Sequence, residues 1–118
     1  MRRTCLALLT AALLAGCSNT ETAASKVVTM GQLDDIEVRQ MRVARENGFL
    51  TVNVALNNTS RSNQTLFYRF AWLDDSGFPV ADEEGWKALP LYGKQAKFLP
   101  AIAPTPKATD FRFEAHTR

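Results

Sequence analysis

The chain has 118 residues, of which 46% are hydrophobic and 22% are charged, so one small globular domain is expected and several domains are excluded. Its formal net charge of +2 includes Arg2 and Arg3, which lie in a predicted export signal. Without these two residues, 12 Lys and Arg side chains balance 12 Asp and Glu side chains. A neutral surface lacks the positive charge that nucleic-acid binding requires, so no nucleic-acid partner is expected.

The first sixteen residues have the pattern of a bacterial export signal. Two arginines precede an apolar run at residues 5–14, which is about half the length that a membrane-spanning helix needs. The run ends in a segment that resembles the lipobox of bacterial lipoproteins, Leu14-Ala15-Gly16-Cys17. This resemblance implies cleavage between Gly16 and Cys17, followed by acylation of Cys17 with diacylglycerol and a further fatty acid such as palmitate.

Lipidation of Cys17 fixes several further expectations. Three acyl chains are more than sufficient for stable membrane anchoring. Ser18, rather than Asp, follows the cysteine, and the sorting rule of enterobacterial lipoproteins then implies the outer membrane, with the domain in the periplasm. Cys5 is removed with the signal, so the mature chain has no disulfide and no free thiol, and no cofactor other than the covalent lipid is expected. Residues 18–25 are polar and small, and residues 17–32 are expected to form a flexible tether after the lipidated cysteine.

The folded part, residues 33–118, alternates apolar and polar residues with a period of two. The pattern is clearest at residues 50–57, 66–73 and 110–115 and is typical of strands with one face on a core. Asn47-Gly48 predicts a tight hairpin between residues 36–45 and 49–57, and a phase change in the first of these strands predicts a bulge near Arg39-Gln40.

Six or seven short strands therefore predict an all-β domain, an antiparallel β-sandwich of the immunoglobulin or fibronectin-III kind, with a small open barrel as the alternative. The strand at residues 66–73 is expected to be central. Residues 78–80 can return from a turn at residues 74–77. The prolines at positions 100, 104 and 106 are expected to interrupt the chain before the last strand.

Several segments of this domain resemble the YcfL-like family of small proteobacterial outer-membrane lipoproteins, whose domain has no assigned function. The segments are Leu56-Asn57-Asn58-Thr59, Tyr68-Arg69-Phe70-Ala71-Trp72-Leu73-Asp74 with Gly77, Trp86, and the strand at residues 108–114. The resemblance covers about residues 30–115 and implies a β-sandwich at the outer membrane. It supplies no catalytic residue.

Three residues are candidates for a ligand or partner patch. Phe67 lies on the strand face opposite Trp72, Arg69 interrupts an apolar strand, and Trp86 follows a charged loop. Core packing is expected for Trp72 because alternating aromatic strands usually pack their rings inward, and partial exposure is one possibility for Trp86.

Other chemistry has weaker support in the sequence. Asp74, Asp75 and Asp82 form a weak calcium candidate, but their spacing matches no calcium-binding loop and a turn explains the first two. His116 is expected to be a solvated residue near a frayed terminus and not a catalytic group. No enzymatic activity is therefore expected.

These observations favour a non-catalytic, lipid-anchored module that presents an edge strand or an aromatic patch to another envelope protein. The alternative is a carbohydrate- or peptidoglycan-binding lipoprotein that uses exposed aromatic side chains such as Trp86.

Overall fold

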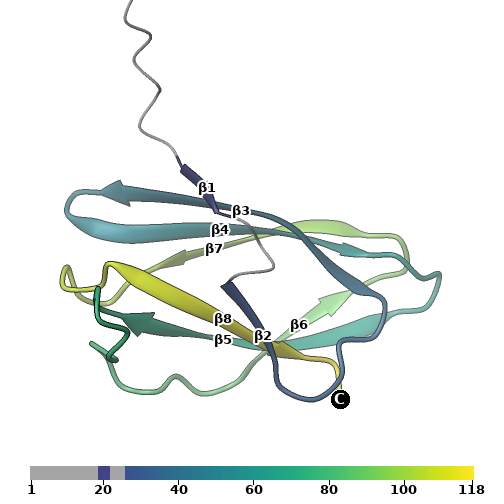
Figure 1. Cartoon of the computed structure of the whole chain (residues 1–118). Helices are drawn as coiled ribbons and strands as arrows, with labels where there is room; N and C mark the ends of the chain where they lie inside the picture. The colour runs from purple at the N-terminus through teal and green to yellow at the C-terminus, as the bar shows by residue number, and fades with distance from the viewer. Residues whose placement is uncertain (1–18, 22–25) are drawn as a thin grey trace, which may run out of the picture.

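The computed structural model describes residues 19–21 and 26–118, and their eight strands form two stacked sheets (Figure 1). The predicted all-β sandwich is confirmed. Two of the strands, near the N-terminus, have three residues each, which brings the number above the expected six or seven.

The first sheet contains β1 (Asn19–Glu21), β3 (Ile36–Glu46), β4 (Phe49–Asn58) and β7 (Ala96–Ile102), in the order β1-β3-β4-β7. All neighbouring strands in it are antiparallel. The predicted hairpin joins β3 to β4 at Asn47 and Gly48, whose φ angles of 52° and 85° suit a tight turn. The predicted bulge is also present, as a register shift between Val38 and Gln40.

The second sheet contains β2 (Val27–Thr29), β5 (Gln64–Leu73), β6 (Lys87–Leu91) and β8 (Asp110–His116), in the order β2-β8-β5-β6. β5 pairs with β8 on one side and with β6 on the other, so the expected central position of this strand is confirmed. β2 pairs with β8 in the parallel direction, and the other pairs are antiparallel.

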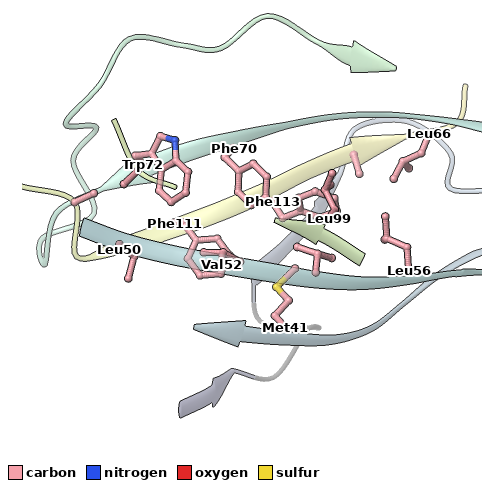
Figure 2. Close-up of a cluster of buried hydrophobic side chains, with 14 of the residues drawn as sticks. Met41, Leu50, Val52, Leu56, Leu66, Phe70, Trp72, Leu99, Phe111 and Phe113 are labelled. Atoms are coloured by element: carbon pink, nitrogen blue, oxygen red, sulfur yellow. The ribbon is translucent and has the colours of Figure 1, made fainter. Parts of the chain in front are cut away.

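The core lies between the two sheets and is built from the inward residues of each alternating strand (Figure 2). Trp72 is 2% exposed and stacks on Phe70 with ring centroids 5.3 Å apart, which confirms its predicted core position. Burial of side chains of this size contributes about 1.5–3 kcal/mol each. The labelled core residues of Figure 2 are Met41, Leu50, Val52, Leu56, Leu66, Phe70, Trp72, Leu99, Phe111 and Phe113.

One buried polar side chain ties two loops together at the end of the sandwich. Asn58 is fully buried, and its Nδ2 donates to the carbonyl oxygens of Ser62, Leu91 and Tyr92 at 2.7, 3.1 and 3.1 Å. Its Oδ1 accepts from the backbone nitrogen of Ser60 at 2.9 Å. The amide is therefore fully used, and it fixes the β4–β5 loop against the end of β6.

β7 is an edge strand, and the prediction that Pro100 interrupts the chain is wrong. Ala103 N donates to Leu50 O and Asn58 N donates to Gln95 O, which sets the alternation of hydrogen-bonded pairs between β4 and β7. In that alternation the backbone of Pro100 points away from β4. The nitrogen of Pro100 therefore faces the free edge, where a proline removes no hydrogen bond between strands.

β6 carries a proline in the same way. Trp72 O accepts from Val80 N, so even-numbered residues of β5 direct their backbone groups toward the β6 side. Pro90 lies opposite Thr65, an odd-numbered residue, and its nitrogen therefore faces outward. Among the described residues, neither β6 nor β7 has a partner on its outer edge.

The predicted return of residues 78–80 from the turn is present but short: Val80 N donates to Trp72 O, Leu73 and Pro79 form a single bridge, and the chain continues as a loop. The expectation for the N-terminal segment differs from the structure. The predicted tether at residues 17–32 includes β2, and Val27 packs against the core. The ordered part therefore begins before residue 33, because a short apolar pair finds an open edge beside β8.

Candidate functional site

The outer face of the second sheet carries paired side chains from β5 and β8. In the antiparallel register Phe67 lies opposite His116, Arg69 opposite Glu114, and Ala71 opposite Arg112. The loop of residues 74–86 passes along this face and adds carboxylates and Trp86. We call this surface the covered face; its residues are Phe67, Arg69, Ala71, Asp82, Glu83, Trp86, Arg112, Glu114 and His116.

Arg69 occupies the centre of the covered face and is bound on three sides. Its Nε donates to Glu114 Oε1 at 2.7 Å, and an Nη donates to Glu83 Oε1 at 2.8 Å. Its guanidinium carbon lies 4.2 Å from the centroid of the Trp86 ring, a cation–π distance. The hydrogen bond to Glu114 holds the pKa of the Arg69 guanidinium above its usual range, with further help from the charge of Glu83. Arg69 is therefore a positioned, neutralised cation and not a free anion receptor.

Three rings continue the cluster beyond Arg69. Trp86 meets His116 edge to face with centroids 4.6 Å apart, and His116 stacks on Phe67 at 5.2 Å. Trp86 is 39% exposed, which confirms the partial exposure considered for it. His116 belongs to β8 and is half-buried, so the expectation of a frayed, solvated residue is wrong. The structure thus brings together all three predicted patch residues.

Glu84 binds the edge of β5 just beyond the first residue of β6, Lys87. Its Oε1 accepts from the backbone nitrogen of Phe70 at 3.0 Å, and its Oε2 accepts from Trp72 Nε1 at 3.1 Å. A side-chain carboxylate thus replaces a neighbouring strand at this point. It also fixes the loop immediately before Trp86, which limits the freedom of the exposed indole.

A groove of about 530 Å³ runs beside this cluster. Arg69, Ala71, Arg112 and Glu114 line it from the sheet, and residues of the loop form the opposite wall, among them Pro79, Ala81, Asp82 and Glu83. The Arg112 side chain is 50% exposed and lies 3.7 Å from Glu114 Oε2, so its guanidinium remains accessible from the groove. The arrangement suits a ligand with both polar and apolar groups.

The residues of the weak calcium candidate do not converge. Asp74 Oδ1 accepts from the backbone nitrogens of Ser76 and Phe78, both at 2.9 Å, which is a turn interaction. Asp82 lines the groove instead. Within the described ranges, no three His, Cys, Asp or Glu side chains come close enough together to hold a metal ion.

The outer face of the first sheet has a different character, and no loop crosses it among the described residues. Registered rows across β3, β4 and β7 are Gln40–Ala55–Phe98, Arg42–Asn53–Pro100 and Ala44–Thr51–Ile102; we call these nine residues the open face. Phe98 is 72% exposed and Ile102 is 68% exposed. Two shallow hollows of about 290 and 280 Å³ lie on it.

Sequence reasoning found Phe67, Arg69 and Trp86 but missed the acidic partners that organise them. Glu114 follows Phe111 and Phe113 in the same strand. An acidic side chain in such an apolar strand indicates that it is paired with a positive charge. Glu83 and Glu84 precede Trp86 in the chain, yet nothing local indicates that one reaches Arg69 and the other reaches Trp72.

The predicted lipidation site lies outside the described residues, as does the whole signal segment. Among residues 19–21 and 26–118, no helix is both long and apolar enough to cross a membrane.

Comparison with known proteins identifies the domain. Residues 22–116 match the family model "Protein of unknown function (DUF1425)". The crystal structure of a DUF1425 family member from Shewanella sp. pv-4 is similar, with a TM-score of 0.64, 31% identity, and coverage of 70% of this chain and 78% of that chain. The structure of Campylobacter jejuni cj0090 is also similar, with a TM-score of 0.59, 26% identity, and coverage of 79% of this chain and 98% of that chain. No curated protein sequence matches the chain. The chain belongs to the DUF1425 family.

Proposed function

We propose that the protein is a lipid-anchored, non-catalytic interaction module of the outer membrane, of the YcfL-like kind, and that its covered face binds another envelope protein. The anchor rests on the lipobox segment ending at Cys17 and on Ser18 after it. The binding surface rests on one observation: an exposed tryptophan is held rigidly at the side of a groove by Arg69, His116 and Glu84.

Rigid, partly exposed tryptophan and arginine side chains are the residue types that dominate binding energy at protein interfaces. Trp86 is fixed by the 4.2 Å contact with Arg69 and the 4.6 Å contact with His116, so little side-chain entropy is lost when a partner covers it. Glu83, with a side chain 78% exposed, and Arg112 supply charge at the rim. The covered face therefore combines an aromatic side chain, a paired arginine at its centre and charged groups at its rim.

Prolines in two of the four edge strands, β6 and β7, disfavour strand addition at those edges. A partner strand needs a continuous row of N–H donors, and Pro90 and Pro100 each remove one from the middle of an edge. Within the groove, the Glu114 carboxylate is bound to Arg69 at 2.7 Å, which occupies it as an ion-pair partner. This pairing supports the proposal of a non-catalytic role.

Site-specific photo-crosslinking in intact cells tests the proposal. A photoreactive residue at position 83, beside Trp86, is expected to yield one dominant protein adduct by mass spectrometry. The control places the same residue at Tyr92, which is 62% exposed at the turn after β6. Adducts that are absent at position 83, or equal at both positions, would overturn the assignment of the covered face.

Sugar binding is the competing function, because an exposed indole beside carboxylates is also a common sugar platform. Co-sedimentation with purified peptidoglycan separates the two. If Trp86→Ala reduces co-sedimentation and Tyr92→Ala does not, the covered face binds glycan and the protein-partner proposal is wrong. If both variants sediment like the parent chain, Trp86 takes no part in glycan binding.

A further inference from the structure

β1 connects the proposed anchor directly to the first sheet. Asn19 pairs with Val43 and Glu21 pairs with Met41, at the edge formed by β3. Cys17 precedes Asn19 by two residues, and two extended residues span about 7 Å. The acylated sulfur therefore cannot move far from this edge while β1 is paired.

The direction of β1 determines which end of the sheet is nearest the lipid. Going from Glu21 back to Asn19, the partners advance from Met41 to Val43, toward Ala44. Ala44 lies in the row that ends at Ile102. β1 and β7 are separated by three strand spacings, or about 14 Å. The anchor and Ile102 thus lie at the same end of one sheet.

The open face itself is suited to a bilayer interface. Phe98 and Ile102 project from β7 with 72% and 68% exposure, and the residues between them and β3 are small or uncharged. Phe49, at the hairpin end, is half-buried. Exposed aromatic and branched side chains on an otherwise flat surface are the groups that enter the headgroup region.

One cation on the same sheet supports this orientation. Arg39 pairs with Glu37 at 3.5 Å, and both side chains are more than half exposed. Arg42 lies on β3 in the middle row of the open face and has no ion-pair partner among residues 26–118. A guanidinium in this position can bind a lipid phosphate. Glu46, at the hairpin end of β3, lines the same hollow as Arg42 and Ile102.

From this placement we infer that the open face lies flat against the phospholipid surface that holds the lipid of Cys17, with Ile102 and Phe98 in the headgroup region. This inference rests on the proposed acylation. It places the covered face on the opposite side of the sandwich, directed away from the membrane, where Trp86 and the groove are accessible to a partner.

The test uses the full acylated chain in vesicles of phosphatidylethanolamine and phosphatidylglycerol. Loss of Cys5 and acylation of Cys17 leave an introduced cysteine as the single free thiol. We compare Ile102→Cys with Phe78→Cys, whose parent residues are 68% and 67% exposed, each labelled with a polarity-sensitive fluorophore. With brominated lipids, about twofold quenching and a shift to shorter wavelength are expected at position 102 and no change at position 78.

The outcomes separate the orientation from the anchor. Equal emission and quenching at both positions in protein that floats with the vesicles would disprove the orientation and leave the anchor standing. Protein that does not float with the vesicles and whose mass shows no acyl chains would disprove the anchor, and with it the proposed orientation. Shielding at position 102 that rises with protein density without bromine quenching would assign the open face to a second copy and overturn the membrane assignment.

Discussion

The two outer faces of this sandwich are built from the same kind of alternating strand, but only one of them is covered. On the covered face the outward residues of β5 and β8 are paired across the strands, and the loop after β5 adds Glu83, Glu84 and Trp86. On the open face the outward residues of β3, β4 and β7 meet solvent, including Phe98 and Ile102.

The difference separates two uses of outward side chains. Those of the covered face make specific contacts within the chain, so their replacement should lower the free energy of unfolding. Those of the open face make few contacts, so their replacement should leave stability unchanged and alter association instead. Each substitution below either sharpens this contrast or breaks it.

The largest loss of stability is expected for Glu84→Ala. The substitution leaves Phe70 N and Trp72 Nε1 without their charged acceptor, and the two lost hydrogen bonds should lower the free energy of unfolding by about 2–3 kcal/mol in urea denaturation. Glu84→Gln keeps one acceptor oxygen and should lose less. Equal stability of Glu84→Ala and the parent chain would show that the loop does not depend on this carboxylate.

A smaller loss is expected for Glu114→Gln. The variant keeps the shape of the side chain but removes the charge that Arg69 Nε faces at 2.7 Å, and the Tm should fall by about 5 °C in circular dichroism. The matched control is Glu83→Gln, since Glu83 also binds Arg69 but its side chain is 78% exposed; its Tm should fall less. The reverse order would place the main partner of Arg69 on the loop and not on β8.

The ion pair of Lys26 and Asp110 should give a small, pH-dependent contribution. Partial burial alone would raise the pKa of Asp110, but the Lys26 hydrogen bond at 2.6 Å and the Phe111 backbone hydrogen bond lower it below its usual value of 3.8. A lowered pKa adds stability above about pH 4 that is lost as the pH falls through the folded-state value.

Asp110→Asn should therefore cost at most about 1 kcal/mol at neutral pH and nothing in strong acid. Urea denaturation across this range provides the measurement. A constant difference between variant and parent at every pH would attribute the effect to packing and not to charge.

The smallest effect on stability is expected on the open face. Ile102→Ser and Phe98→Ser should each change the free energy of unfolding by less than about 0.5 kcal/mol, because both side chains are more than two-thirds exposed. Urea denaturation of the soluble domain measures this. A loss comparable to that of Glu84→Ala would mean that the open face is part of the stable structure, and the contrast between the faces would fail.

Features of the fold that depend on neighbouring residues could be predicted from the sequence. The period of two identified β3, β4, β5 and β8, and Asn47-Gly48 located the hairpin because both residues accept positive φ angles. β7 was missed because Pro100 resembles a chain break. Its tolerance depends on which edge its nitrogen faces, and that is known only once β4 is in place.

The candidate site was only half predictable for a related reason. Trp86 and Arg69 stand out locally as an aromatic after a charged loop and a cation among apolar residues. Their partners do not: Glu114 lies 45 residues from Arg69, and Glu83 lies 14 residues away. Glu114 lies opposite Arg69 only because of the register of β5 with β8. Glu83 comes within reach of Arg69 only because of the path of the loop.

The prolines within β6 and β7 have a consequence for the membrane-anchored state proposed above. A lipid-bound protein diffuses in two dimensions and meets its own copies at a high effective concentration. Sheets with unprotected sides would join laterally under such crowding and grow into fibrils. With one donor missing from the outer edge of β6, at Pro90, and one from that of β7, at Pro100, a continuous ladder between neighbouring copies cannot form along these two edges, which lowers the tendency of the proposed lipoprotein to polymerise.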